Sequence, residues 1–151
     1  DAISTSTVIE SVQGILMTDG TLSATFANAS AGSDYYIGVS HRNSLEVWSA
    51  APVTFTAVTS YNFTTSLAQA WSIGLDPMVE VSTGVFALWT GDLNQDDFID
   101  ASDFIIYDTD NAAGLLLDYY ATDMNGDGFV DASDFTIYDY SNSVGPFFIQ
   151  P

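Results

Sequence analysis

The chain contains no lysine, no cysteine and a single arginine, Arg42, against 20 Asp and Glu residues in 151 positions. Its net charge of −19 at pH 7 leaves no basic patch of the kind that nucleic acids and anionic membrane surfaces require. The lack of cysteine excludes disulfide bonds and cysteine-ligated zinc. No apolar run approaches the roughly 18 residues of a membrane span. Aromatic residues make up 14% of the chain, which separates it from acidic disordered sequences.

The first part of the chain, residues 1–90, has the pattern of short β-strands separated by turns. Asp19-Gly20 is a hairpin-turn signal, and in residues 44–50 Leu45 and Val47 alternate with polar or amphipathic neighbours. This spacing predicts an Ig-like antiparallel β-sandwich that just reaches seven strands and lacks one if any candidate fails. The stretch 66–83 is expected to be a loop with one irregular or helical turn. The strands are expected in residues 6–17, 21–26, 34–40, 44–50, 52–58, 61–65 and 84–90.

The second part, residues 91–151, contains an internal duplication. Residues 91–111, "GDLNQDDFIDASDFIIYDTDN", align without gaps to residues 122–142, "TDMNGDGFVDASDFTIYDYSN", with 13 of 21 positions identical. Carboxylates this dense repel one another unless a cation lies among them, and the chain has almost no cationic side chain to offer.

The spacing of the repeated acids matches a calcium-binding loop. Calcium takes about six to eight oxygen ligands, and an EF-hand-type loop supplies them from positions 1, 3, 5, 7, 9 and 12. Every one of these positions carries a suitable oxygen in both copies. The sequence therefore predicts two Ca²⁺ ions, held in the first loop by Asp92, Asn94, Asp96, the carbonyl of Phe98, Asp100 and Asp103, and in the second by Asp123, Asn125, Asp127, the carbonyl of Phe129, Asp131 and Asp134.

Two further positions set the shape of each loop. Position 6 needs a sharp turn, which suits Gly128 better than Asp97, so the first loop is expected to be more strained. Position 8, Ile99 and Val130, is expected to form an apolar contact between the paired loops. A helix should begin inside each loop, at Ala101-Ser102-Asp103 and Ala132-Ser133-Asp134.

A duplicated loop-then-helix unit with Asp at position 12 and no preceding helix resembles the dockerin family over residues 91–145. The resemblance implies two antiparallel loop–helix units with pseudo-twofold symmetry, each binding calcium. Dockerins that bind cohesins carry basic residues along their helices, and this chain has none there. A purely structural use is therefore favoured over cohesin binding.

The whole chain also resembles the C-terminal regions of large secreted or surface proteins of Bacteroidetes-type bacteria, in which an Ig-like sandwich precedes a dockerin-like pair. The resemblance rests on "DYYIGVSHRNSLEVWSAAPVTF" and "GDLNQDDFIDASD". Those regions begin with further strands before the equivalent of Asp1. The sequence shows no signal-peptide pattern, and its start directly in Ser/Thr-rich, strand-like sequence is expected of a mature or trimmed product. Its richness in Ser, Thr, Ala and Gly without Lys predicts an extracellular or cell-surface location.

Three functions are compatible with this sequence. The favoured one is a structural module that forms a homopolymer, a fibre or surface layer, by strand addition, with "STSTVIESV" or "PFFIQP" as the donated strand. The others are an anchoring module for a cohesin-like surface protein and a glycan-binding module built on Trp48, Trp71 and Trp89. Catalysis is not expected, because no nucleophile–base set is present. The single His41-Arg42-Asn43 run is interpreted as a hairpin end, with Arg42 paired to a carboxylate.

Overall fold

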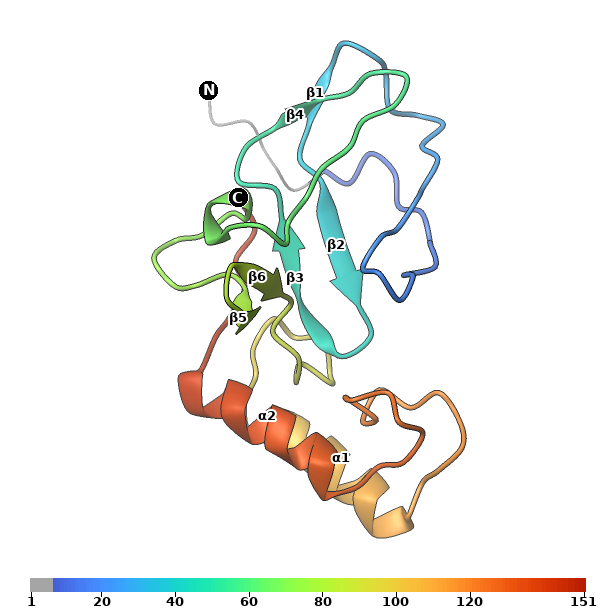
Figure 1. The fold of residues 1–151 in the computed structure, drawn as a ribbon, viewed down its shortest axis with the longest axis vertical. Coiled ribbons are helices and arrows are strands. Elements are labelled where there is room, and N and C mark those ends of the chain that lie inside the picture. Colours follow the sequence, from blue (N-terminus) through green and yellow to red (C-terminus); the bar gives the residue numbers. More distant parts are fainter. Residues whose placement is uncertain (1–6) are drawn as a thin grey trace.

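The structure is a computed structural model that describes residues 7–151. This part of the chain combines three two-stranded antiparallel sheets with two helices that lie at one end of the molecule (Figure 1). The sheets pair β1 with β4, β2 with β3, and β5 with β6. The elements are β1 (Asp34–Tyr35), β2 (Gly38–His41), β3 (Ser44–Trp48), β4 (Val53–Thr54), the short 3₁₀ helix η1 (Leu67–Gln69), β5 (Val79–Ser82), β6 (Val85–Ala87), α1 (Ala101–Ala113) and α2 (Ala132–Val144).

The β2–β3 hairpin agrees closely with its sequence pattern. Leu45 and Val47 are buried on one side of β3, with 3% and 2% of their surface exposed, whereas Glu46 and Trp48 are only partly buried. Arg42 and Asn43 form the turn between His41 and Ser44, as expected of a hairpin end. This turn points toward the helical end of the molecule (Figure 1).

Several predicted strands are absent. Residues 7–33 form no strand, although the Thr18–Gly20 turn is present and the Met17 N–H donates to the Thr21 carbonyl at 2.8 Å. Residues 61–65 also form none, and β5 lies in the stretch that was predicted to be a loop. Alternation favours a strand only where a partner strand and a core cover one face, and Leu22 and Phe26 find neither, remaining 47% and 38% exposed.

The core joins the β part to the helical part. Leu45 and Trp89 pack in one cluster with Ile99, Tyr138 and Phe148. Two further clusters complete the core. One is centred on Val47, Ala70 and Met78, and the other, in the duplicated region, on Leu93, Tyr107 and Val130.

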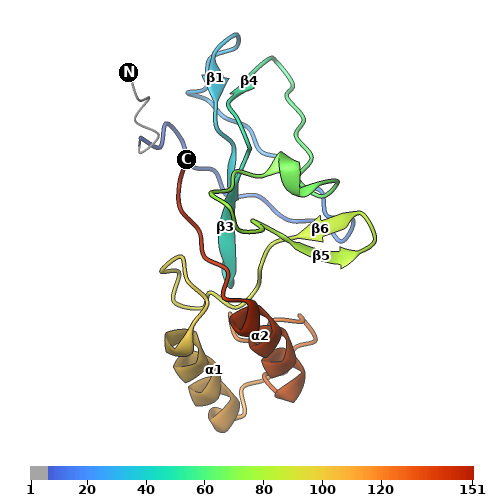
Figure 2. The same ribbon diagram turned by 90° about the vertical axis from the view of Figure 1, so that its left-hand side faces the viewer.

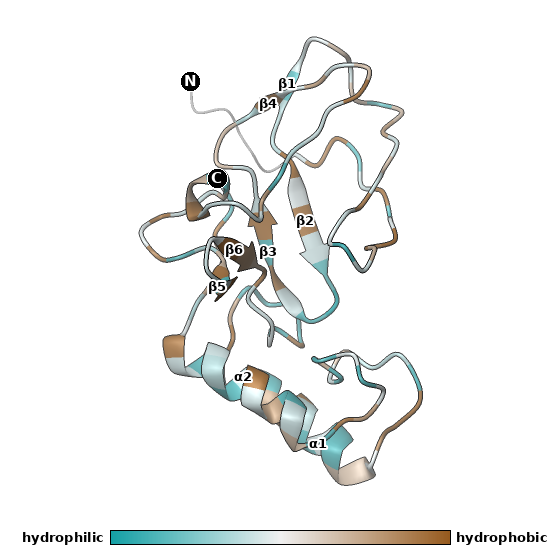
Figure 3. Ribbon diagram, viewed as in Figure 1, coloured by the Kyte–Doolittle hydropathy of each residue, from teal (hydrophilic) through white to brown (hydrophobic). Residues whose placement is uncertain are grey.

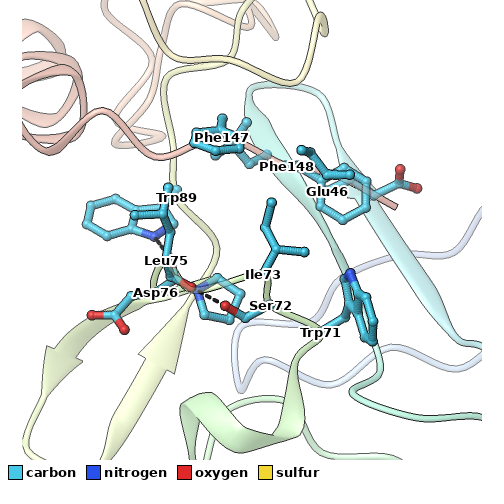
Figure 4. Close-up of a pocket in the computed structure, with 12 residues that line it drawn as sticks. Glu46, Trp71, Ser72, Ile73, Leu75, Asp76, Trp89, Phe147 and Phe148 are labelled. Carbon is cyan, nitrogen blue, oxygen red and sulfur yellow. Dashed lines mark hydrogen bonds between the residues drawn. The ribbon is translucent and has the colours of Figure 1, made fainter. Parts of the chain in front are cut away.

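The C-terminal segment returns from α2 alongside β3 (Figure 2). Its Phe147 forms an isolated antiparallel bridge with Phe98, and the Phe148 N–H donates to the Asp97 carbonyl at 2.9 Å. Together with the loop that carries Trp71, this segment encloses a small cavity lined mainly by apolar side chains (Figure 4). In the described residues, none of the helices is both long enough and apolar enough to cross a membrane.

Candidate metal centre

Each predicted calcium loop is wound around its first and last carboxylates. Asp92 and Asp123 at position 1 are 2% and 5% exposed, and Asp103 and Asp134 at position 12 are both 0% exposed. The side chains at positions 3, 5 and 9 lie at the surface. Each loop therefore has two buried carboxylates, at positions 1 and 12, which are called its acidic floor below. The polar side chains at positions 3, 5 and 9 are exposed and are called its rim.

Backbone N–H groups of the same loop organise the buried carboxylates. Asp103 Oδ1 accepts from the N–H groups of Leu93 at 2.7 Å and Asn94 at 3.2 Å, and its Oδ2 accepts from Asp100 at 2.9 Å. The second loop repeats this pattern around Asp134, with the N–H groups of Met124, Asn125 and Asp131 at 2.7, 3.1 and 2.9 Å. The repeat is thus a repeat of structure as well as of sequence.

The exposed rims also match between the loops. Asn94 Nδ2 donates to Asp96 Oδ2 at 2.8 Å and to Ser102 Oγ at 2.9 Å, and Asn125 makes the equivalent bonds to Asp127 and Ser133 at 2.9 and 2.7 Å. The Phe98 and Phe129 side chains at position 7 are half exposed, and their backbones form isolated bridges with Phe147 and Leu116.

Both helices begin inside their loops, as the sequence predicts. Asp100 and Asp131 are the N-cap residues, with the same φ of −146° and ψ of −167°, and each accepts a hydrogen bond from the backbone two residues later. Asp103 and Asp134 complete capping boxes by accepting from the N-cap N–H groups. The position-12 carboxylate therefore fixes the loop and the first helical turn together.

The tight turn at position 6 is left-handed in both copies. Asp97 has φ of 72° and Gly128 has φ of 87°. A non-glycine residue in this region carries strain, so the expectation of a more strained first loop is supported by the backbone. Position 4 is also left-handed in both loops, with φ of 59° at Gln95 and 74° at Gly126.

The two units are joined by reciprocal contacts. Ile99 of the first loop packs in a cluster with Tyr138 of α2, and Val130 of the second loop packs in a cluster with Tyr107 of α1. The Tyr107 hydroxyl donates to the Asp131 carbonyl, and the Tyr138 hydroxyl donates to the Asp100 carbonyl, both at 2.8 Å. The expected pairing of Ile99 with Val130 is wrong, because the two side chains lie in separate clusters, each against the opposite helix.

The acidic floor lacks a cationic side chain. Burial raises the pKa of Asp92 to about 6, and burial also raises the pKa of Asp103. Arg42 is the only Lys or Arg of the chain, and it was predicted to pair with a carboxylate. Among the described residues it pairs with none, and its Nη2 donates instead to the backbone carbonyl of Asp123 at 3.0 Å. Buried carboxylates are costly when nothing positive offsets them, so these loops are suited to a cation.

Within residues 7–151, no three or more His, Cys, Asp or Glu side chains are grouped so that they could hold a metal ion. The oxygens of Asp92, Asp103, Asp123 and Asp134 point at loop N–H groups, and each predicted donor set also relies on an asparagine and a backbone carbonyl. The donor chemistry and the loop path fit a hard cation, while the acidic side chains are not clustered as ligands in this conformation.

Sequence reasoning missed two residues that contact the loops. Arg42 reaches the second loop from the β2–β3 turn, and Asn43 Nδ2 donates to the Ala121 carbonyl at 3.0 Å. The only signal in the sequence was that Arg42 is the single cationic residue of the β part. The three tryptophans form no exposed platform: Trp89 is buried, and Trp48 and Trp71 are partly buried. Comparison of the chain with family models, curated proteins and solved structures found no match.

Proposed function

We propose that this chain is a non-enzymatic, calcium-stabilised structural module of an extracellular surface or secreted assembly. Residues 91–145 act as a dockerin-like pair of loop–helix units, and residues 1–90 act as an Ig-like β part. The observation that carries the proposal is the pair of matching loops, whose four nearly buried carboxylates have no cationic side chain to offset them.

Calcium would supply that missing charge. Each loop offers four aspartates, one asparagine and one backbone carbonyl, which is the kind of oxygen set that calcium prefers. The loop N–H bonds already hold the carboxylates at positions 1 and 12 near the centre of the loop. Binding would require the acidic side chains, which are not clustered as ligands in this conformation of residues 7–151, to turn toward a common centre.

Titration calorimetry and thermal melting test the calcium site. We expect two calcium ions for each chain and a melting temperature that falls when a chelator is added, since a ligand that binds only the folded state stabilises it. Magnesium at the same concentration is the matched control, because it prefers a rigid octahedral site with several retained waters. Absence of calcium binding heat, with equal melting in calcium and in chelator, would refute the proposal.

Self-association is supported by the exposed apolar front segment. Between residue 7 and β1, several hydrophobic stretches lie on an irregular trace (Figure 3). A single chain leaves these large side chains exposed to water. Within residues 7–151, β2 pairs only with β3, so one edge of β2 has no partner strand there. The exposed residues of the segment are Val8, Ile9, Val12, Ile15, Leu16, Met17, Leu22 and Phe26.

The occupant that we propose for the free β2 edge is the front segment of a second copy. Of the two candidate donors, the C-terminal "PFFIQP" is already engaged with its own chain, since Phe147 bridges to Phe98 and Phe148 is only 9% exposed. The front donor, residues 4–12, lies outside the described residues up to residue 6. Residues 7–12 form no strand, although the Glu10 carboxylate accepts from the N–H groups of Ala27 and Asn28 at 3.0 and 2.7 Å. A head-to-tail contact of this kind does not close and produces a filament.

Light scattering and negative-stain microscopy in calcium test the assembly. Val8→Asp places a charge on a side chain that is 65% exposed in the proposed donor strand, residues 4–12, and we expect it to abolish polymers. Val58→Asp is the matched control, because Val58 is 87% exposed but lies outside that segment. A wild-type protein that stays monomeric at high concentration in calcium, or equal loss of polymers in both variants, would contradict the donor assignment.

A further inference from the structure

The two loops differ at position 4 in a way that changes how position 1 is held. In the first loop, Gln95 Nε2 donates to the carbonyl of Asp92 at 2.7 Å. In the second loop, position 4 is Gly126, which has no side chain. The carbonyl of Asp123 there accepts a hydrogen bond from Arg42 Nη2 at 3.0 Å instead. Both position-1 carbonyls are therefore bound by a side-chain N–H group, but the second donor comes from outside the loop.

Arg42 also contacts an aromatic ring. Its guanidinium carbon lies 3.9 Å from the centre of the Tyr119 ring, a cation–π distance. The neighbouring Asn43 donates to the carbonyl of Ala121 at 3.0 Å, so the β2–β3 turn is bound to the chain on the approach to the second loop. Gln95 reaches the residue that follows this turn, since its Nε2 donates to the Ser44 carbonyl at 3.4 Å. Both donors thus connect a loop to one end of the β2–β3 hairpin.

We propose that Arg42 is the positioning residue of the second loop and replaces, from the β part, the hydrogen bond that Gln95 supplies within the first loop. The inference rests on the proposed calcium binding. Its physical basis is that the peptide of Asp123 sets where the position-1 carboxylate lies, and groups that orient a ligand affect metal affinity strongly. The guanidinium also repels a nearby cation, so removing it has two opposing effects on calcium affinity. The proposal requires that the orienting effect of Arg42 on the Asp123 carboxylate outweighs its repulsion of the calcium ion.

The design of a rescue variant follows from the first loop. Gln95 adopts φ of 59° and Gly126 adopts φ of 74°, so glutamine is compatible with this backbone. A Cβ atom added at Gly126 meets no atom within 4 Å. Gly126→Gln therefore gives the second loop an internal donor of the kind that the first loop has, and it does so without restoring the charge of Arg42.

NMR calcium titration of the full chain measures each loop separately. The amide of Asp97 donates to Asp92, and the amide of Gly128 donates to Asp123, so their resonances report the first and second loops. We expect Arg42→Met to weaken the second loop about tenfold or more while the first loop is unchanged. Gly126→Gln in the Arg42→Met background should restore the affinity of the second loop. The matched variant Gln95→Gly should weaken only the first loop.

Each other outcome overturns the proposal. Unchanged or tighter binding at the second loop of Arg42→Met would show that charge repulsion outweighs orientation. Equal weakening of both loops would indicate a general loss of folded structure, and failure of Gly126→Gln to restore binding would exclude a role for the carbonyl bond. A wild-type chain that binds no calcium refutes the proposed function itself, and this is seen before any variant is made.

Discussion

Replacing Asp134 by alanine removes the residue that ties the second loop to its helix. The side chain is fully buried and accepts three backbone hydrogen bonds, at 2.7, 3.1 and 2.9 Å. Asp134→Ala leaves these three N–H groups without their acceptor and removes the capping box of α2. A hydrogen bond to a charged group contributes about 1.5–3 kcal/mol, part of which is offset because a buried charge is also removed. We expect a net cost of about 3 kcal/mol in chelator.

Thermal melting in chelator and in calcium separates the two roles of this carboxylate. For a chain of this length, about 3 kcal/mol corresponds to a fall of roughly 10 °C in melting temperature. In calcium at about 1,000 times the dissociation constant, the wild type gains a further 4 kcal/mol or so for each site, and the variant should lose that gain at the second site. Asp139→Ala, which removes an exposed carboxylate of α2, is the control for charge. Melting in chelator that equals the wild type would refute the structural role. A calcium-dependent gain that equals the wild type would refute the role as a ligand.

Two further predictions concern the first loop. Asp97→Gly relieves a left-handed φ of 72° and should stabilise the protein in chelator by up to about 1 kcal/mol. The reverse change Gly128→Asp should destabilise it by a similar amount. Denaturant unfolding measures both variants, and effects of the same sign would show that position 6 of the first loop is not strained. Burial raises the pKa of Asp92 to about 6, above its unfolded value, so the metal-free protein should become more stable as pH falls from 7 through 6, while calcium binding to the first loop should weaken over the same range. Asp92→Asn should reduce this pH dependence of stability in chelator, and a wild-type stability that falls between pH 7 and pH 5 would show that the sign is wrong.

The helical part followed from the sequence because its signals are local. The N-caps Asp100 and Asp131, the capping boxes and the left-handed turns at position 6 depend on neighbouring residues, so a repeated pattern fixes them twice. The contacts between the units were not predictable in the same way. Tyr107 and Tyr138 reach across to carbonyls that are 24 and 38 residues distant in the chain.

The β part was predicted less well because strand formation depends on distant partners. Residues 44–48 formed the expected strand since Leu45 and Val47 face a core that residues of both halves build. Residues 21–26 have an equally regular alternation, yet no partner strand covers them in residues 7–151. The contact of Arg42 with Asp123 spans 81 positions, which periodicity does not report.

The β2–β3 turn has one more consequence, for digestion by proteases. Arg42 is the only position in the chain after which a protease specific for lysine and arginine can cut. The peptide bond that follows Arg42 lies in the turn. The Asn43 carbonyl there accepts from the Gly91 N–H at 2.7 Å, and the Asn43 side chain donates to the Ala121 carbonyl. Asn43 as a whole is only 2% exposed. A protease needs an extended and accessible segment, so cleavage must wait until this turn leaves its place against the loops. The rate of that single cut therefore measures how often the junction between the β part and the helical part opens.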